Sequence, residues 1–169
     1  MDETPWETPD DPDNDKPDNL ETVDVTVVGI WEGRPDPDTD PEDEGPLSET
    51  FVKLVDRKDR ELPIFIGPFE AMSILAALGG GAPERPLAHD LVRSVVDRLG
   101  ASIESVIIDD LFQGTFYARI LLTDSDGQTV GIDSRPSDAI AVGVRAKVPI
   151  RVAERVMKEA GRPSDPDND

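Results

Sequence analysis

The segment from Gly131 to Ile150, GIDSRPSDAIAVGVRAKVPI, constrains the fold more than any other part of the chain. Pro136 suits the first turn of a helix, because its φ is already fixed and that position needs no N–H group. The six residues at 139–144, AIAVGV, are apolar on every side of such a helix. A helix without a polar face is usually buried. We therefore predict a central helix that begins near Pro136 and is held at the core.

Four polar residues stand at the start of this helix: Asp133, Arg135, Ser137 and Asp138. One interpretation is purely structural, because a carboxylate in the first turn of a helix satisfies free N–H groups and the positive end of the dipole. An Arg–Asp pair would complete such a cap. The other interpretation is that these residues form the corner of an active site. The segment alone leaves both interpretations open.

The net charge of −20 lies mainly in three proline-rich segments. Residues 1–20, 32–49 and 163–169 hold 19 of the 37 acidic residues, two of the 17 basic residues and 10 of the 16 prolines. Segments of this composition cannot bury enough apolar surface to fold. The excess of Asp over Lys is typical of proteins from extreme halophiles, with an ordinary acidic tail as the alternative. The expected organisation is a disordered acidic arm (1–20), one domain (21–161) with an acidic loop insertion (32–46), and an acidic tail (162–169).

The chain contains no cysteine, which is compatible with a reducing compartment and excludes a disulfide framework. No apolar run reaches the ~20 residues that a membrane span needs, and no basic start precedes an apolar stretch. We therefore expect a cytoplasmic protein without a membrane partner.

Hydrophobic periodicity predicts seven strands and four helices. The strands are expected at 22–31, 47–55, 62–66, 101–111, 115–123, 128–133 and 147–150. The helices are expected at 67–78, at 87–99, from Pro136 onwards and at 151–160. The first three strands suggest an antiparallel meander. The fold class is therefore α+β, with a mostly antiparallel sheet and three or four packed helices in a single domain.

Two of these helices carry apolar stripes that we expect to face the core. In the first helix the stripe consists of Ala71, Ile74, Leu75 and Leu78. In the second it consists of Leu87, Leu91, Val92, Val95, Val96 and Leu99. Apolar helices in so small a body also indicate a homo-oligomer.

The strands at 115–123 and 128–133 should form a hairpin whose register follows from their apolar faces. Aligning Ile120 with Ile132 requires a three-residue loop that ends with Gly127 in the left-handed conformation. The same register sets Arg119 opposite Asp133, close enough for the side chains to pair. We therefore expect Arg119 to reach the polar corner at the start of the central helix.

Four segments together resemble the bifunctional nuclease domain. They are LPIFIGPFEAMSI (62–74), RPLAHDLVRSVVDRLGASIESVIIDDL (85–111), GTFYARILL (114–122) and GIDSRPSDAIAVGVRAKVPIRVAE (131–154). The resemblance covers about residues 22–160, with the elements in the family's order. It implies a nuclease that acts on DNA and RNA, so nucleic acid would be the substrate. The acidic loop at 32–46 departs from the family pattern and should affect only the surface.

Catalytic residues can be suggested from chemistry. Hydrolysis of a phosphodiester needs a divalent metal or a base–acid pair, together with positive charge for the phosphate. The candidates for catalysis are His89, Glu70 and Asp138, and His89 is the only histidine in the chain. The candidates for phosphate binding are Arg119 and Arg135, because guanidinium groups match phosphate geometry.

Hard divalent cations prefer carboxylate oxygens. The candidate ligands for Mg²⁺ or Mn²⁺ are Asp133, Asp138, Asp109 and Asp110. No fixed spacing of a known two-metal carboxylate set is present, so the sequence suggests a metal without defining its site.

His89 also has a simpler interpretation. His89, Arg93 and Asp97 follow each other at four-residue steps, opposite the apolar stripe of their helix. Such a row is typical of a solvated, salt-bridged face. A lone histidine on a helix surface specifies no chemistry by itself.

Two other functions compete with the nuclease. A non-catalytic interaction or regulatory domain of the same fold is favoured by the lack of a dense basic patch. An enzyme acting on small molecules or nucleotides would be expected to carry a glycine-rich phosphate loop. The run Gly79–Gly81 follows a predicted helix, whereas a phosphate-binding loop precedes one, so we interpret this run as the end of the helix.

Overall fold

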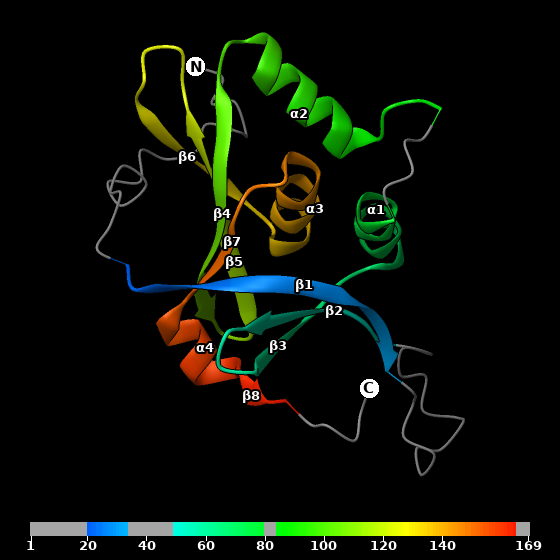
Figure 1. Cartoon of the computed structure of the whole chain (residues 1–169). Helices are drawn as coiled ribbons and strands as arrows, with labels where there is room; N and C mark the ends of the chain where they lie inside the picture. Colours follow the sequence, from blue (N-terminus) through cyan, green and yellow to red (C-terminus); the bar gives the residue numbers. More distant parts are fainter. Residues whose placement is uncertain (1–19, 34–48, 80–83, 165–169) are drawn as a thin grey trace, which may run out of the picture.

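The computed structural model describes residues 20–33, 49–79 and 84–164 (Figure 1). The strands are β1 (Thr22–Gly33), β2 (Glu49–Asp56), β3 (Arg60–Phe65), β4 (Ser102–Phe112), β5 (Thr115–Thr123), β6 (Thr129–Ser134), β7 (Ile150–Ala153) and β8 (Arg162–Pro163). The helices are α1 (Pro68–Leu78), α2 (Ala88–Arg98), α3 (Pro136–Ala146) and α4 (Glu154–Ala160). Nearly all of the acidic arm, most of the acidic loop and the end of the tail lie outside the described residues.

The eight described strands form one sheet in the order β6-β5-β4-β7-β1-β2-β3-β8. Only β4 and β7 pair in parallel, and every other described neighbour pair is antiparallel. The predicted α+β class with a mostly antiparallel sheet is therefore confirmed. The meander β1-β2-β3 is present as expected.

The centre of the sheet is covered on both faces. In β4, the four residues 105–108 are buried in succession, although side chains of a strand alternate between faces. Val106 lies against Gly143 of α3. On the other face of the sheet, Arg155 of α4 forms an ion pair with Asp110 of β4. Figure 1 shows α1, α2 and α3 grouped together, apart from α4.

Helix α3 is the buried element that the sequence predicts. Its residues 139–143 are all buried, as is Pro136 at its first position. The helix ends at Lys147, which adopts the left-handed conformation with φ 57°. Gly143 lets the helix approach the sheet closely, because a Cβ there would lie 3.0 Å from Cγ2 of Val106 and 3.2 Å from Cγ1 of Ile150.

Replacing Gly143 with Ala should therefore destabilise the protein. The added methyl group would force Val106 and Ile150 to move, and overpacking of this kind costs about 1–3 kcal/mol. The gain in helix propensity, at most ~1 kcal/mol, offsets only part of this. Urea denaturation followed by circular dichroism would measure the change. A Gly143→Ala protein as stable as the wild type would show that the helix–sheet contact is looser than described.

Some boundaries differ from the predictions because the chain turns sharply after α3. Lys147 closes the helix, so β7 begins only at Ile150, where it pairs with Val25 of β1 and Val106 of β4. The predicted strand at 147–150 and helix at 151–160 thus shift to β7 and α4. Strand β1 continues to Gly33, into the predicted loop, and β8 lies in the predicted tail.

Helix α2 is turned the opposite way from the prediction. The stripe expected in the core is largely exposed, and none of the helix's residues is buried. Two members of the row expected in solvent bond to the body instead, where His89 contacts Asp138 at 3.1 Å and Arg93 donates to the carbonyl oxygen of Arg145 at 2.8 Å, whereas Asp97 is exposed as predicted. In α1, Ala71 and Ile74 are buried as predicted, but Leu75 and Leu78 are exposed. None of the described helices has the length and apolar character needed to cross a membrane.

Candidate active site

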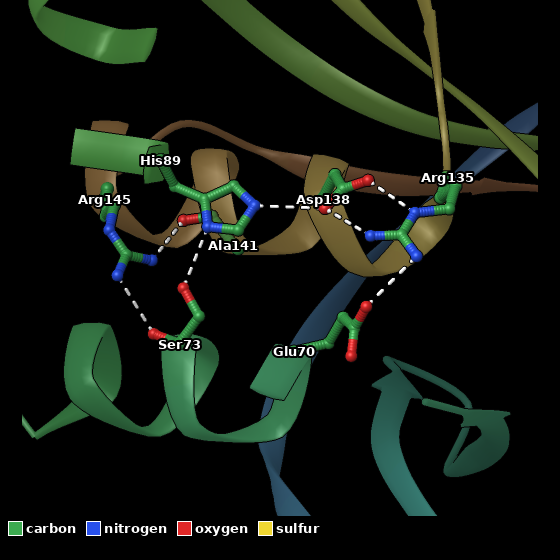
Figure 2. A network of polar contacts seen from close by, with 7 residues as sticks. All are labelled: Glu70, Ser73, His89, Arg135, Asp138, Ala141 and Arg145. Atoms are coloured by element: carbon green, nitrogen blue, oxygen red, sulfur yellow. Dashed lines mark hydrogen bonds and ion pairs between the residues drawn. The ribbon is translucent and has the colours of Figure 1, made fainter. Parts of the chain in front are cut away.

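The first turns of three helices converge at one place. Glu70 lies in the first turn of α1, His89 in that of α2 and Asp138 in that of α3. Figure 2 shows His89 pointing toward Asp138, with Arg135 between Asp138 and Glu70. The structure thus brings together four of the residues selected from the sequence, from segments far apart in the chain.

Arg135 links α1 to α3. It is the N-cap of α3, with an extended backbone, and Pro136 follows it in the first helical turn. Its guanidinium donates from Nε to Asp138 Oδ2 at 2.7 Å and from Nη2 to Asp138 Oδ1 at 3.1 Å. Its Nη1 lies 3.0 Å from Glu70 Oε1. The Arg135 side chain is still 66% exposed, so part of it faces solvent.

These contacts keep Asp138 ionised. The hydrogen bonds from Arg135 hold the pKa of Asp138 below its usual value, and a hydrogen bond with His89 lowers it further. Partial burial raises this pKa but does not outweigh the hydrogen bonds. The same pairing raises the pKa of Arg135, so the guanidinium stays charged. At neutral pH the corner contains a fixed cation between two carboxylates.

Both ring nitrogens of His89 have partners. Nε2 lies 3.1 Å from Asp138 Oδ1, and Nδ1 lies 2.9 Å from the hydroxyl oxygen of Ser73 (Figure 2). An ionised carboxylate only accepts, so Nε2 carries a hydrogen. In the neutral ring, Nδ1 then accepts the hydroxyl hydrogen of Ser73. The order Ser73–His89–Asp138 is that of a nucleophile, a base and a carboxylate that orients the base.

Arg145 joins α1, α2 and α3 through hydrogen bonds next to the site. Its side chain is only 6% exposed. It donates to the carbonyl oxygens of Ser73 in α1 at 3.1 Å and Ala141 in α3 at 3.0 Å, and to Asp90 Oδ1 in α2 at 2.8 Å. Sequence reasoning selected neither Arg145 nor Ser73. No local signal marks them, because Arg145 bonds to α1 and α2 and Ser73 bonds to α2, which are far from them in the chain.

Two hollows flank the pair formed by Glu70 and Arg135, which line both. The larger, of about 520 Å³, lies between α1 and the start of α2 and contains Ser73, His89 and Asp138. Its other lining residues are mostly apolar: Phe69, Met72, Ala76, Leu87 and Ala88. The smaller, of about 330 Å³, lies on the side of β3 and β5 and is lined in part by Phe65, Phe116 and Ser137.

The remaining predicted site residues lie elsewhere. The hairpin register is as predicted, with Arg119 opposite Asp133 and Gly127 in the left-handed conformation at φ 80°. However, Arg119 Nε donates to Asp109 Oδ2 at 2.5 Å, and Asp133 is exposed. Strand alternation places these side chains on the face of the sheet away from α3, so Arg119 does not reach Asp138.

The four carboxylates proposed as metal ligands do not form one cluster. Asp109 pairs with Arg119, Asp110 pairs with Arg155 at 3.3 Å, and both oxygens of Asp138 already accept hydrogen bonds. Within residues 20–33, 49–79 and 84–164, no group of three or more His, Asp or Glu side chains is placed to hold a metal ion.

Comparison with known proteins identifies relatives over most of the described body. The family model of the bifunctional nuclease domain matches residues 52–165. An uncharacterized protein of Mycobacterium tuberculosis strain H37Rv is 44% identical over 103 residues, which are 61% of this chain and 60% of that protein. Bifunctional nuclease 1 of Oryza sativa subsp. japonica is 31% identical over 121 residues, 70% of this chain and 37% of that protein.

Bifunctional nuclease 1 of Arabidopsis thaliana is 29% identical over 112 residues, 65% of this chain and 34% of that protein. The matched region thus spans 60% or less of the length of each of these relatives.

Proposed function

Because the chain belongs to the bifunctional nuclease domain family, we propose that it hydrolyses phosphodiester bonds of DNA, RNA or both at the corner formed by Glu70, His89, Arg135 and Asp138. The observation that carries this proposal is the juxtaposition of a Ser–His–Asp hydrogen-bond chain with an exposed arginine. The first supplies a route for a proton, and the second supplies a binding group for a phosphate.

Arg135 is the phosphate-binding group in this proposal. A guanidinium has five N–H donors, and three of them are used by Glu70 and Asp138. The others are left for two oxygens of a phosphate. The two carboxylates preorganise the guanidinium, which reduces the entropy lost when substrate binds. They also reduce its net charge, so binding would depend on close hydrogen bonds instead of a broad basic field.

His89 is the proton-transfer group. Asp138 holds the Nε2–H, so the basic nitrogen Nδ1 faces the Ser73 hydroxyl. The ring can accept a proton there, either from Ser73 or from a water molecule that takes its place, and Asp138 stabilises the imidazolium that forms. General acid–base catalysis of this kind contributes about 10²–10⁴-fold to a rate.

Exposed aromatic rings beside the site suit a nucleic-acid substrate. Phe65 and Phe69 line the two hollows on either side of Arg135, and both rings are largely exposed. Bases of single-stranded nucleic acid stack on such rings without regard to sequence. When one phosphate of a nucleic-acid strand binds Arg135, the bases on its two sides could stack on Phe65 and on Phe69.

A requirement for Mg²⁺ or Mn²⁺ remains a prediction. The described residues, as they are placed, do not offer a set of ligands for such an ion. The steps above are therefore written only through the side chains of this chain.

The test is cleavage by the purified protein in molar KCl with Mg²⁺, with Mn²⁺ and with EDTA, on single-stranded DNA and RNA. The Asp138→Asn protein should retain its fold, but its cleavage rate should fall at least about 10²-fold. An amide has only one oxygen to accept the two hydrogen bonds from the Arg135 guanidinium, and it carries no charge to stabilise an imidazolium. The matched control is Asp126→Asn, the same change at an exposed turn residue, which should cleave like the wild type.

Equal cleavage by the wild type and Asp138→Asn would reject this site. No cleavage by a folded wild-type protein under any of these conditions would reject the nuclease and favour the non-catalytic interaction domain. Loss of cleavage in EDTA, restored by Mn²⁺ or Mg²⁺, would establish the metal requirement.

A further inference from the structure

Helix α2 turns His89 and Arg93 of its polar side toward the body and exposes its apolar side. His89 and Arg93 face the body, where they bond to Asp138 and to the carbonyl oxygen of Arg145. Leu91 is 59% exposed and Leu99 is 74% exposed. An amphipathic helix normally does the reverse. Hydrogen bonds hold α2 in this orientation, so its apolar face is left without cover within the described chain.

The start of α2 lies beside apolar residues of α1. The larger hollow of the candidate site lies between the two helices, and Phe69, Met72 and Leu87 line it from both sides. Phe69 is 82% exposed, and Leu75 and Leu78 extend the patch along α1. Many exposed large apolar residues on neighbouring helices are typical of an interaction site.

The segments outside the described residues are poor in large apolar side chains. Residues 1–19, 34–48, 80–83 and 165–169 contain only three large apolar residues, Met1, Trp6 and Leu47. Most of the rest are Asp, Glu, Pro, Thr, Asn and Gly. Burying several exposed Leu and Val side chains needs more apolar surface than that. A second copy of the chain would bring a matching apolar surface to this patch.

The apolar stripe of α2 is complementary to itself in reverse. The apolar positions within α2 and its C-cap are 88, 91, 92, 95, 96 and 99, and none of them is charged, whereas Leu87 is the N-cap and lines the larger hollow. Consider a second copy of α2 that runs antiparallel to the first, related by a two-fold axis that passes between residues 93 and 94. Position 91 of one copy then lies opposite 96 of the other, position 92 lies opposite 95, and position 88 lies opposite 99. Every apolar residue then meets an apolar residue, as a two-fold interface requires.

We propose that this chain forms a two-fold homodimer in which α2 packs antiparallel against α2 of a second copy, with the exposed side of α1 enlarging the interface. An 11-residue helix is only about 16 Å long, so α2 alone is small for a stable interface, which usually buries ~1,200 Å² or more in total. The added surface of α1 places the second copy at the mouth of the larger hollow. The proposal does not depend on the nuclease activity.

Electrostatics permits this association. The three proline-rich segments carry most of the net charge, and the rest of the chain holds 18 acidic and 15 basic residues. Two nearly neutral bodies repel each other weakly, and salt screens what repulsion remains. The buried apolar area therefore decides the outcome.

The test is the mass in solution by light scattering after gel filtration, at a chain concentration of tens of micromolar. The wild type should have about twice the 18.4 kDa mass of one chain. The double variant Leu91→Glu with Val95→Glu should have the mass of one chain and an unchanged circular dichroism spectrum, because both side chains are already exposed in the single chain.

The matched control is Val28→Glu with Phe112→Glu, which adds the same charge at exposed apolar residues of β1 and β4 and should remain dimeric. A wild type with the mass of one chain overturns the proposal, as does a double variant that stays dimeric. If the glutamate variant is unfolded, Leu91→Ser with Val95→Ser is measured in its place, and the same outcomes decide.

Discussion

Replacing His89 with Gln should slow phosphodiester cleavage by about 10²–10⁴-fold while leaving the fold intact. The glutamine amide can donate to Asp138 and accept from Ser73, so the hydrogen bonds that join α1, α2 and α3 are preserved. It cannot take up a proton near neutral pH. The variant therefore separates proton transfer from structural support, and single-turnover cleavage rates would measure the difference.

The control for this prediction is Asp97→Asn, which lies two turns further along the same helix and is exposed. It should cleave at the wild-type rate. A His89→Gln protein within threefold of the wild-type rate would mean that His89 serves only to hold the helices together.

Replacing Arg60 with Met should lower the free energy of unfolding by about 3 kcal/mol, more than the other substitutions proposed for this protein. Arg60 of β3 donates from Nε to Asp56 Oδ2 at 2.8 Å, and its Nη1 and Nη2 donate to Glu154 at 3.0 and 2.8 Å. The Asp56 side chain is 2% exposed. Methionine fills a similar volume but leaves a buried carboxylate without its cation, and such a loss is strongly destabilising. Urea denaturation would measure it.

The matched control is Arg57→Met, only three residues away. Arg57 is almost fully exposed and pairs with Asp24 at 3.4 Å in solvent. Exposed pairs contribute little, so this change should alter the free energy of unfolding by less than about 1 kcal/mol. Similar losses in both variants would show that the buried pair is no stronger than a surface pair.

The same network should make the wild type less stable in acid. Burial raises the pKa of Asp56, but hydrogen bonds from Arg60 and from the N–H of Lys58 outweigh this and lower it below 3.8. The hydrogen bonds of Arg60 likewise lower the pKa of Glu154 below 4.5. Both carboxyls therefore contribute stability above about pH 4.5, which is lost as the pH falls through their folded pKa values. In Arg60→Met this loss should be smaller.

Local patterns in the sequence were sufficient for most of the fold. The apolar run of α3 and Pro136 at its start predicted a buried helix, and the alternation in β5 and β6 predicted their register, with Arg119 opposite Asp133. Both depend on residues that are near each other in the chain. The end of α3 was less clear, because Lys147 closes it in a left-handed conformation that this residue type does not signal.

The candidate site was predictable only in part. Glu70 and Asp138 were recognisable because each follows a proline at the start of a helix. Their meeting with His89 was not, since it requires the packing of three helices. Ser73 and Arg145 carry no local signal at all, and the side-chain pairing of Arg119 with Asp109 depends on β4, which lies beside β5 in the sheet.

The sequence by itself determined which segments form the four helices and all the described strands except β8, because periodicity and helix ends are local properties of the chain. It did not determine which way α2 faces. Periodicity shows that this helix has an apolar side and a polar side, and the apolar side is normally the buried one. The tertiary structure decided otherwise, because Asp138 and the carbonyl oxygen of Arg145 offer hydrogen bonds to His89 and Arg93 at the body's surface. Those contacts brought His89 into the candidate site and left the apolar stripe facing outward.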